Sequence, residues 1–347
     1  MNITGDKLVK RTIVGVLALS FAGSVFAGAV LAETCDFPEH DLTLLPTTDG
    51  GAVEVSLELF LNDVTTINDA TQSFTSDVFV MAKWQDDRLR HDGQGACSVE
   101  GSQIWTPELK FGNRRSLQEL LAPELKVKPD GEVTRTVRAY GDFTFREDLS
   151  NFPFDHQDVL FTILAGYPLE AVTFIAPGEN IGMAEVVSVA NWRITFGENR
   201  LSGYYIKPLD RTLARLDVVF RAERLTGYYT WQLLVPLILV VMMTWAVFWM
   251  PLEFVAPRVG LVATSMLTLI AYRFSMASVL PPIAYLTRMD VFMVASSVLV
   301  FAALAAAVAV THFEGRGDTV KANRINLASR WLAPLLFLIV LARVFAL

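Results

Sequence analysis

Charged residues are scarce in this chain of 347 residues: they make up 19% of it, whereas soluble domains approach a quarter. Histidine occurs four times and cysteine twice, and the sequence contains no HExxH pair, nucleophile elbow or phosphate-binding glycine loop. We therefore expect no enzymatic activity, no metal site and no cofactor. Hydrophobic residues make up 52% of the chain, which favours a membrane protein with a large exposed domain.

The charges that are present are unevenly divided. Between Glu33 and Arg224 there are 31 acidic residues against 18 basic ones, and the remainder of the chain has 5 acidic and 11 basic residues. An acidic half is thus joined to an apolar half with mildly basic edges. We expect no nucleic-acid partner, because binding to phosphates needs a basic face.

The first 32 residues have the pattern of a secretory signal peptide. Lys7, Lys10 and Arg11 precede an apolar run over residues 12–29, and small residues suited to cleavage follow at 30–32. The alternative is a first transmembrane helix. We predict a signal peptide over 1–32, so that the following domain lies outside the cytoplasm.

The two cysteines, Cys35 and Cys97, would then lie in an oxidising compartment. They can form a disulfide there. Two free thiols are the alternative, and the sequence does not decide between them.

Residues 33–224 are predicted to form strands. The runs 53–61, 77–84 and 215–220 alternate apolar with polar residues, and turn sequences separate such runs. This period of two indicates half-buried antiparallel strands. About 190 residues of this kind, without a convincing long amphipathic helix, favour one immunoglobulin-like β-sandwich.

Four apolar segments follow within residues 225–347. Residues 225–252 and 291–311 carry no charge, and residues 259–287 and 331–347 carry one each, Arg273 and Arg343. Because a spanning helix needs about 20 residues, we predict four transmembrane helices at about 226–250, 258–279, 288–312 and 328–346. The link over 312–330 is then cytosolic, and its basic residues agree with the positive-inside rule.

One stripe of residues follows the second of these helices. At about 100° per residue its members stay within about 40° of one line along the helix. They are Gly260, Thr264, Leu267, Ala271, Phe274 and Ser278. Small residues of this kind also occur where membrane helices pack together. The other interpretation is a pore, which requires several copies of the helix around one axis.

Five motifs resemble the pentameric ligand-gated ion channels, the Cys-loop receptor superfamily. Residues 152–157, Phe-Pro-Phe-Asp-His-Gln, resemble the hallmark loop of that family, although its two cysteines would fall at Phe145 and Val159. Their absence is similar to the bacterial members. The other motifs are Trp-Gln-Asp-Asp-Arg-Leu at 84–89, Ile-Trp-Thr-Pro-Glu-Leu at 104–109, Arg-Leu-Thr-Gly-Tyr-Tyr at 224–229 with Pro236, and 257–261 followed by Leu-Pro-Pro at 280–282.

The resemblance implies an all-β extracellular sandwich followed by a four-helix transmembrane bundle, assembled as a homopentamer. It implies a ligand-gated channel in the bacterial inner membrane, with the N-terminal domain on the periplasmic side and inorganic ions passing through. The stripe on the second helix would line the pore. Leu267 would form a hydrophobic constriction that closes by dewetting, and Phe274 a second apolar ring.

The resemblance also places Pro257 and Arg258 at the inner mouth of the pore. No carboxylate accompanies them, which favours anions, because rings of like charge set which ion is tolerated. Two observations oppose this choice. Cation-conducting relatives also carry a basic residue there, turned away from the ions, and the acidic extracellular half would enrich cations.

An agonist site between subunits is implied as well. One face would use Lys110, Tyr167, Tyr204 and Tyr205, and the neighbouring subunit would supply Phe79. The aromatic rings suit an organic cation, whereas Lys110 repels an amine, so a ligand that carries a carboxylate satisfies both. Protons are a second candidate stimulus, and ordinary strand residues without a ligand are the alternative.

Coupling between the two halves is assigned by the resemblance to Arg224, which would pair with Asp155 and Asp69, and to Pro281 after the second helix. An arginine fork between two carboxylates is strongly directional. The alternative is that the cluster only stabilises the junction. A non-conducting periplasmic sensor remains the rival function, although the link over 312–330 is too short for an output domain.

Overall fold

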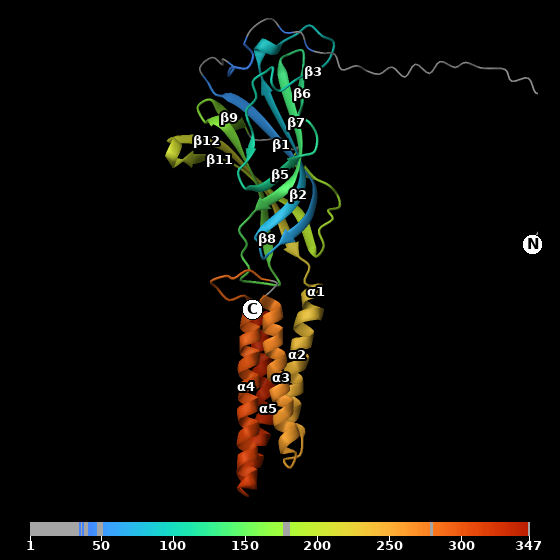
Figure 1. The fold of residues 1–347 in the computed structure, drawn as a ribbon, viewed down its shortest axis with the longest axis vertical. Coiled ribbons are helices and arrows are strands. Elements are labelled where there is room, and N and C mark those ends of the chain that lie inside the picture. The colour runs from blue at the N-terminus through green and yellow to red at the C-terminus, as the bar shows by residue number, and fades with distance from the viewer. Residues whose placement is uncertain are drawn as a thin grey trace, which may run out of the picture.

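The computed structural model describes residues 35, 37, 41–46, 51–175, 181–277 and 280–345. The predicted signal peptide and Ser278 lie outside the described residues. A β-sandwich stands on a bundle of helices in one elongated molecule (Figure 1). The predicted fold class, a sandwich followed by four membrane helices, is confirmed.

The sandwich consists of a larger and a smaller sheet. The larger sheet contains β1 (Val53–Asn68), β2 (Ser73–Gln85), β3 (Cys97–Val99), β5 (Arg114–Glu119), β6 (Glu124–Val127), β7 (Glu132–Thr144), β9 (Val172–Ile175) and β10 (Gly182–Met183). The smaller sheet contains β4 (Lys110–Phe111), β8 (His156–Pro168), β11 (Trp192–Ile206) and β12 (Arg211–Arg224). Two short 3₁₀ turns, Asp87–Leu89 and Lys207–Leu209, lie between strands.

The larger sheet is mixed, although the sequence predicted antiparallel strands. Strand β1 pairs antiparallel with β2 but parallel with β9 and β10. Between β8 and β9 the chain passes from the smaller sheet to the larger one, and β9 enters beside β1. Alternation within one strand shows which face is buried but not whether its partner runs parallel or antiparallel. The parallel pairing of β1 could therefore not be predicted from the sequence pattern.

The core between the sheets is built by the alternation. The side chains of Leu57, Leu59 and Leu61 on β1 are fully buried, each contributing about 1.5–3 kcal/mol relative to an exposed position. Phe143 on β7 packs against Phe161 on β8 with ring centroids 4.9 Å apart. This contact packs the two sheets against each other.

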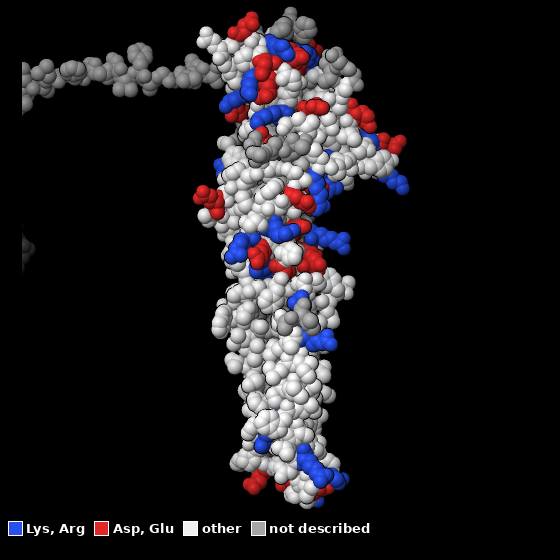
Figure 2. Space-filling model, turned by 180° about the vertical axis from the view of Figure 1, so that it is seen from behind, with Lys and Arg blue, Asp and Glu red and all other residues white. Residues whose placement is uncertain are grey.

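Among the residues that the structure describes, four helices are long and apolar enough to cross a membrane. The first span, Gly227–Trp249, comprises α1 (Gly227–Tyr229), a π-helical turn (Thr230–Leu234), α2 (Val235–Ala246) and a 3₁₀ turn (Val247–Trp249). It is followed by α3 (Val255–Ala277), α4 (Arg288–Gly315) and α5 (Thr319–Phe345). Figure 2 shows charged residues on the sandwich and at the far end of the helices, with a largely uncharged band between them.

Two prolines inside these spans leave backbone carbonyls that neighbouring helices satisfy. Pro236 has no amide hydrogen for the carbonyl of Gln232, and the hydroxyl of Tyr272 on α3 donates to that oxygen at 3.2 Å. Pro334 likewise spares the carbonyl of Arg330, which accepts from the indole Nε1 of Trp245 on α2 at 2.7 Å. These bonds fix α3 against the first span, and α5 against α2.

The last helix begins at Thr319, earlier than the start near 328 that the sequence analysis gave. Basic residues delimited the predicted span, yet charge marks the depth of a residue in the membrane rather than the end of a helix. Arginine and lysine are good helix formers, so α5 continues through them to the short link after α4. Gly317 in that link has φ 78°, a conformation that suits glycine.

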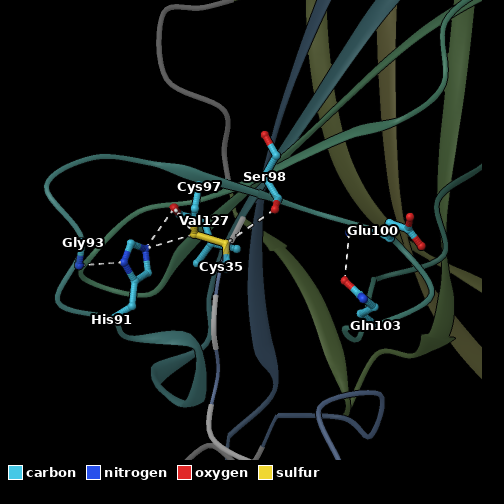
Figure 3. The surroundings of a disulfide bond; sticks show 8 residues. All are labelled: Cys35, His91, Gly93, Cys97, Ser98, Glu100, Gln103 and Val127. Carbon is cyan, nitrogen blue, oxygen red and sulfur yellow. Dashed lines mark hydrogen bonds between the residues drawn. A yellow bond between two sulfur atoms is a disulfide. The ribbon is translucent and has the colours of Figure 1, made fainter. Parts of the chain in front are cut away.

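Cys35 and Cys97 form a disulfide. The bond ties the N-terminal extension to β3, and Figure 3 shows His91 beside it. The amide of Gly93 donates to Nδ1 of His91 at 3.1 Å, and Nε2 lies 3.3 Å from the carbonyl of Val127. Nε2 of His91 also lies 3.4 Å from Sγ of Cys97.

We predict that replacing Cys35 by Ser lowers the free energy of unfolding by about 2–4 kcal/mol, because the bond restricts the unfolded chain. Intact-mass analysis of the denatured mature protein should show one pair of hydrogens gained on reduction. Alkylation of both thiols in the non-reduced, denatured protein would contradict the bond.

Candidate functional site

Arg224 ends β12, at the level where the sandwich meets the helices. Only 4% of the residue is exposed, and its guanidinium donates to two carboxylates. Nε and Nη2 contact the two oxygens of Asp155 at 2.8 and 3.0 Å, and Nη1 and Nη2 contact those of Asp69 at 2.8 and 3.1 Å. Both edges of the fork are therefore occupied.

Aromatic rings enclose the same guanidinium. Its central carbon lies 4.1 Å from the ring centroid of Trp192, 5.0 Å from that of Phe152 and 5.5 Å from that of Tyr229. Burial opposes the charge, but the hydrogen bonds and attraction of Asp155 and Asp69 outweigh it and hold the pKa of Arg224 above its ordinary value. The group is a permanent cation in a low-dielectric junction.

Local structure explains how these partners meet. Trp192 on β11 is the register partner of Arg224 on β12, which brings its ring beside the guanidinium. Gln157 at the start of β8 donates to Asp155 at 2.6 Å and also to the carbonyl of Asp148 at 2.8 Å. Asp69 follows β1 in the turn toward β2. Three strand ends thus converge on one cation.

Glu147 lies beside this cluster and was not selected by the sequence analysis. It is 5% exposed, and neither carboxyl oxygen has a hydrogen-bond partner among the described residues. Burial, followed by the negative charge of Asp69, raises the pKa of Glu147 to about 8, against a smaller opposing effect of Arg224. Glu147 lies in a connection between strands, where no hydrophobic period reports burial.

The loop of residues 145–155 joins the cluster to the helices. The amide of Leu149 donates to the hydroxyl of Tyr285 at 3.0 Å. Arg288 donates through its amide to the carbonyl of Ser150 at 3.0 Å and through Nε to Asn151 at 2.9 Å. Tyr285 and Arg288 are the residues around the α3–α4 link that make these bonds.

The resemblance assigned the role at this link to Pro281, and that role stays a prediction. The residue is half-buried in the link. The family motif at 280–282 contains the proline but no side chain that can form a hydrogen bond. It therefore did not point to Tyr285 or Arg288. Leu149 and Phe152 are fully buried and pack in the same hydrophobic cluster as Met276 of α3 and Met289 of α4. The loop is therefore anchored in the bundle by apolar contacts as well.

The predicted stripe lies on the face of α3 that its own chain leaves uncovered. Its described members Gly260, Thr264, Leu267, Ala271 and Phe274 are all exposed. The exposed fraction reaches 68% for Leu267 and 75% for Phe274. Val262, Ser265, Leu269 and Met276 on the opposite face are buried. One face of this helix is buried and the other exposes large apolar residues along one line. Such an exposed face is expected to pack against another surface or to line a pore.

Arg258, which the resemblance placed at the inner mouth, does not face the exposed stripe of α3. Its side chain is fully buried within the chain. Nε donates to the carbonyl of Val247 at 3.2 Å, and Nη2 donates to the side chain of Asn326. Arg258 precedes Gly260 by two residues, which turns it by about 200° from the exposed stripe, toward the carbonyls at the end of the first span. Pro257, its predicted companion, is exposed in the first turn of α3.

Three of the predicted agonist residues lie at one end of the smaller sheet. Tyr167 on β8 is half-buried, and its ring centroid lies 5.5 Å from that of Trp105. Tyr204 and Tyr205 are exposed on the β11–β12 hairpin, which projects from the sandwich (Figure 1). Through β12 the register links Tyr204 to Pro168, the neighbour of Tyr167.

The other two predicted agonist residues, Lys110 and Phe79, belong to different sheets. Lys110 on β4 forms an exposed ion pair with Glu108 at 3.7 Å and lines a cavity with Arg114 and Arg135. Phe79 is on β2 of the larger sheet, where the guanidinium of Arg138 lies 5.1 Å from its ring centroid. One chain alone does not bring Phe79 to the tyrosines, and its place in a neighbouring subunit stays a prediction.

No group of three or more His, Cys, Asp or Glu side chains able to hold a metal ion occurs among the described residues. The described residues form a charged junction that is largely shielded from solvent, and next to it lies α3, one face of which is exposed. Binding at the sandwich and movement of the helices can be linked through such a junction.

Comparison with known proteins extends this description. The family model described as the neurotransmitter-gated ion-channel ligand binding domain matches residues 34–175. The model described as the neurotransmitter-gated ion-channel transmembrane region matches residues 233–340. The two matches follow one another in the same order as the sandwich and the helices, and together they cover more than two thirds of the chain.

Two curated relatives are receptor subunits. The chain is 26% identical over 288 residues to the gamma-aminobutyric acid receptor subunit beta-4 of Gallus gallus, with 80% of this chain and 59% of the relative covered. It is 27% identical over 311 residues to the gamma-aminobutyric acid receptor subunit beta of Lymnaea stagnalis, with 83% and 62% covered. The chain thus spans about three fifths of the length of these relatives.

The family is one of ion channels rather than enzymes, in agreement with the expectation from the sequence. Four membrane-spanning helices after a receptor domain make this a multi-pass membrane protein whose N-terminal domain is extracellular. From the two matched regions, in the order and over the elements that the structure shows, the chain belongs to the neurotransmitter-gated ion-channel family.

Proposed function

We propose that this chain is one subunit of a homopentameric ligand-gated ion channel whose pore is lined by α3. The exposed stripe of α3 is the observation that carries the proposal. Leu267 and Phe274 face away from their own chain, and five copies around an axis would bring these residues together along a water-filled path. The family membership supports the assembly, since both halves of the chain match it.

The closed gate in this proposal is a ring of Leu267 side chains. Apolar rings of small radius expel water, and an ion cannot cross them without its hydration shell. Thr264 lies one turn away on the same face, and its hydroxyl donates to the carbonyl of Gly260 at 2.9 Å. An anion is bound by donors, so Thr264 would contact a partly dehydrated anion by turning its O–H from that carbonyl toward the pore.

Transmission would run from the sandwich to α3 through the contacts described above. Movement of β8 and β12 displaces Asp155 and Arg224, which sit at the membrane-side ends of those strands. The loop of residues 145–155 follows, and its bonds to Tyr285 and Arg288 reach the link between α3 and α4. A shift of that link changes the tilt of α3.

The agonist we propose is a small organic molecule with a carboxylate, bound between subunits. Tyr167, Tyr204 and Tyr205 would form one side with Lys110, and Phe79 of the neighbouring subunit the other. The two relatives carry the name of gamma-aminobutyric acid, which has an acid and an amino group, and Glu108 beside Lys110 offers a carboxylate for such an amine. Protons are the second candidate stimulus.

We place the protein in a bacterial inner membrane, with the sandwich in the periplasm. Two features support this. The family cysteines are replaced by Phe145 and Val159, and the link between α4 and α5 is only a few residues long. Both are similar to the bacterial branch, in which the cytosolic insertion is missing.

Anions are the permeant ions we propose. The first turn of α3 carries Val255, Ala256 and Pro257, all exposed and none acidic, and the preceding carboxylate, Glu253, lies outside the helix. Since Arg258 is buried, the support comes from the missing carboxylate and not from a basic ring.

The gate is tested by Leu267→Thr in purified protein reconstituted into liposomes. A hydroxyl ring is wettable, so chloride flux should appear without any stimulus, whereas wild-type liposomes stay tight. Leu338→Thr on α5, also 61% exposed, is the matched control and should leave the resting flux unchanged. Resting flux and stimulus threshold equal to wild type would remove Leu267 from the gate.

Selectivity is tested by placing a carboxylate at the inner end of α3. We expect Ala256→Glu to move the reversal potential in asymmetric salt from the chloride toward the cation equilibrium potential, since five negative charges would attract cations. Ala256→Gln has nearly the same size without charge and should keep the wild-type reversal potential. A wild-type channel that already follows the cation gradient would overturn the proposed anion conduction.

The junction is tested by Arg224→Ala and Arg224→Lys. Removing one side of a buried ion pair typically costs about 3–5 kcal/mol, so Arg224→Ala should assemble in the membrane but conduct poorly at the strongest effective stimulus. Arg224→Lys keeps the charge and loses the fork, and we expect an intermediate response.

Arg221→Ala is the control for this series, because Arg221 is exposed on the same strand. Asp155→Asn should resemble Arg224→Ala, since it leaves the cation underpaired. Agonist binding should weaken only by the share of affinity linked to opening. Near-normal gating in Arg224→Ala would show that the cluster is not the coupling element.

A further inference from the structure

Glu147 is a buried carboxyl group without a donor. It lies between β7 and β8 in the loop that contacts the helices, and 5% of the residue is exposed. Neither of its carboxyl oxygens has a hydrogen-bond partner among the described residues. An ionised carboxylate in such a place loses its hydration and gains no hydrogen bond in return.

The groups that face Glu147 come from three other segments and from the end of its own loop, and only one of these groups is a cation. They are Asp69 from the β1–β2 turn, Asp155 from the end of the loop, Arg224 from β12 and, through its contact with Arg224, Tyr229 from α1. Arg224 already donates to both aspartates and to the hydroxyl of Tyr229. No donor of the guanidinium fork is left for Glu147.

Protonation resolves this imbalance. Ionised Glu147 would place three carboxylates around one guanidinium, a net charge of two negative units in a buried cluster. A protonated Glu147 leaves one negative unit, and its O–H is a hydrogen-bond donor facing the carboxylate of Asp69. Carboxyl groups that share a site take up a proton for this reason.

We propose that Glu147 is a proton-binding site of the junction, occupied at neutral pH, whose proton joins Asp69 to Glu147 and keeps Asp69 in place for Arg224. Loss of the proton puts two like charges side by side and pushes Asp69 from the fork. The effect on gating rests on the proposed channel function. The proton site itself does not.

The pH range follows from the direction of the shift. Burial and the charge of Asp69 raise the pKa of Glu147 to about 8 from an ordinary value of 4.5. The proton is therefore retained well above the pH at which an exposed glutamic acid loses it, and it leaves as the pH rises through about 8. Below that range the junction is complete, and above it the junction is weakened.

The site is tested directly by infrared difference spectroscopy on the full-length protein in phosphatidylcholine liposomes. We expect a protonated carboxyl band that disappears as the pH rises through about 8 and that is missing in Glu147→Gln. The amide of glutamine keeps the size and a donor toward Asp69, so this variant should fold. Glu170→Gln, a substitution of an exposed glutamate, should keep the band. A titrating band that persists in Glu147→Gln, or no band near this pH in the wild type, would overturn the proposal.

Ion flux tests the consequence for gating. Stimulated flux of the wild type should fall about fivefold or more between pH 7 and pH 9, within the usual range of coupling between two sites. Glu147→Gln should keep its flux over the same range, and Glu170→Gln should follow the wild type. An equal fall in Glu147→Gln would overturn the regulatory role. If the wild type conducts at no pH, the channel function fails, whereas the infrared titration still decides the proton site.

Discussion

One buried guanidinium joins three strand ends of the sandwich at the level where the helices begin. Arg224 is almost completely buried and donates hydrogen bonds to Asp155 and Asp69, which lie at the ends of different strands. A charge in such a place is stable only while its partners stay, because losing one leaves an uncompensated ion. The strand ends, the loop of residues 145–155 and the start of the first span are therefore constrained as one unit, in which Glu147 contributes a proton rather than a charge.

Below the junction, the position of α3 is set by polar bonds that compensate for prolines and helix ends. Tyr272 donates to the carbonyl that has no amide donor at Pro236, and Arg258 donates to a carbonyl at the end of the first span. Both side chains belong to the side of α3 that its own chain covers. The opposite side, with Leu267 and Phe274, remains uncovered as a consequence. The same contacts that stabilise the bundle thus present one line of residues to the assembly.

Periodicity predicted the sandwich and the four spans, because burial repeats along strands and spans are long enough to be read from composition. It failed where the deciding interaction is not periodic. Arg258 was placed at the inner mouth by its position in a motif, although its helical phase turns it inward. Glu147 lies in a loop, and its burial arises from partners that are distant in the sequence. The parallel pairing of β1 with β9 and β10 is also a matter of topology that no single strand records.

The central claim, that the Arg224 cluster transmits a signal to a gate on α3, is tested most directly by combining Arg224→Ala with Leu267→Thr. We expect the double variant to conduct in liposomes as Leu267→Thr alone does and not to respond to stimulus. The gate is then hydrated, while the contacts of Arg224 that transmit the signal are lost. A double variant that stays silent while Leu267→Thr conducts would show that Arg224 is needed for the pore itself. A double variant that still responds fully to stimulus would show that transmission takes another route.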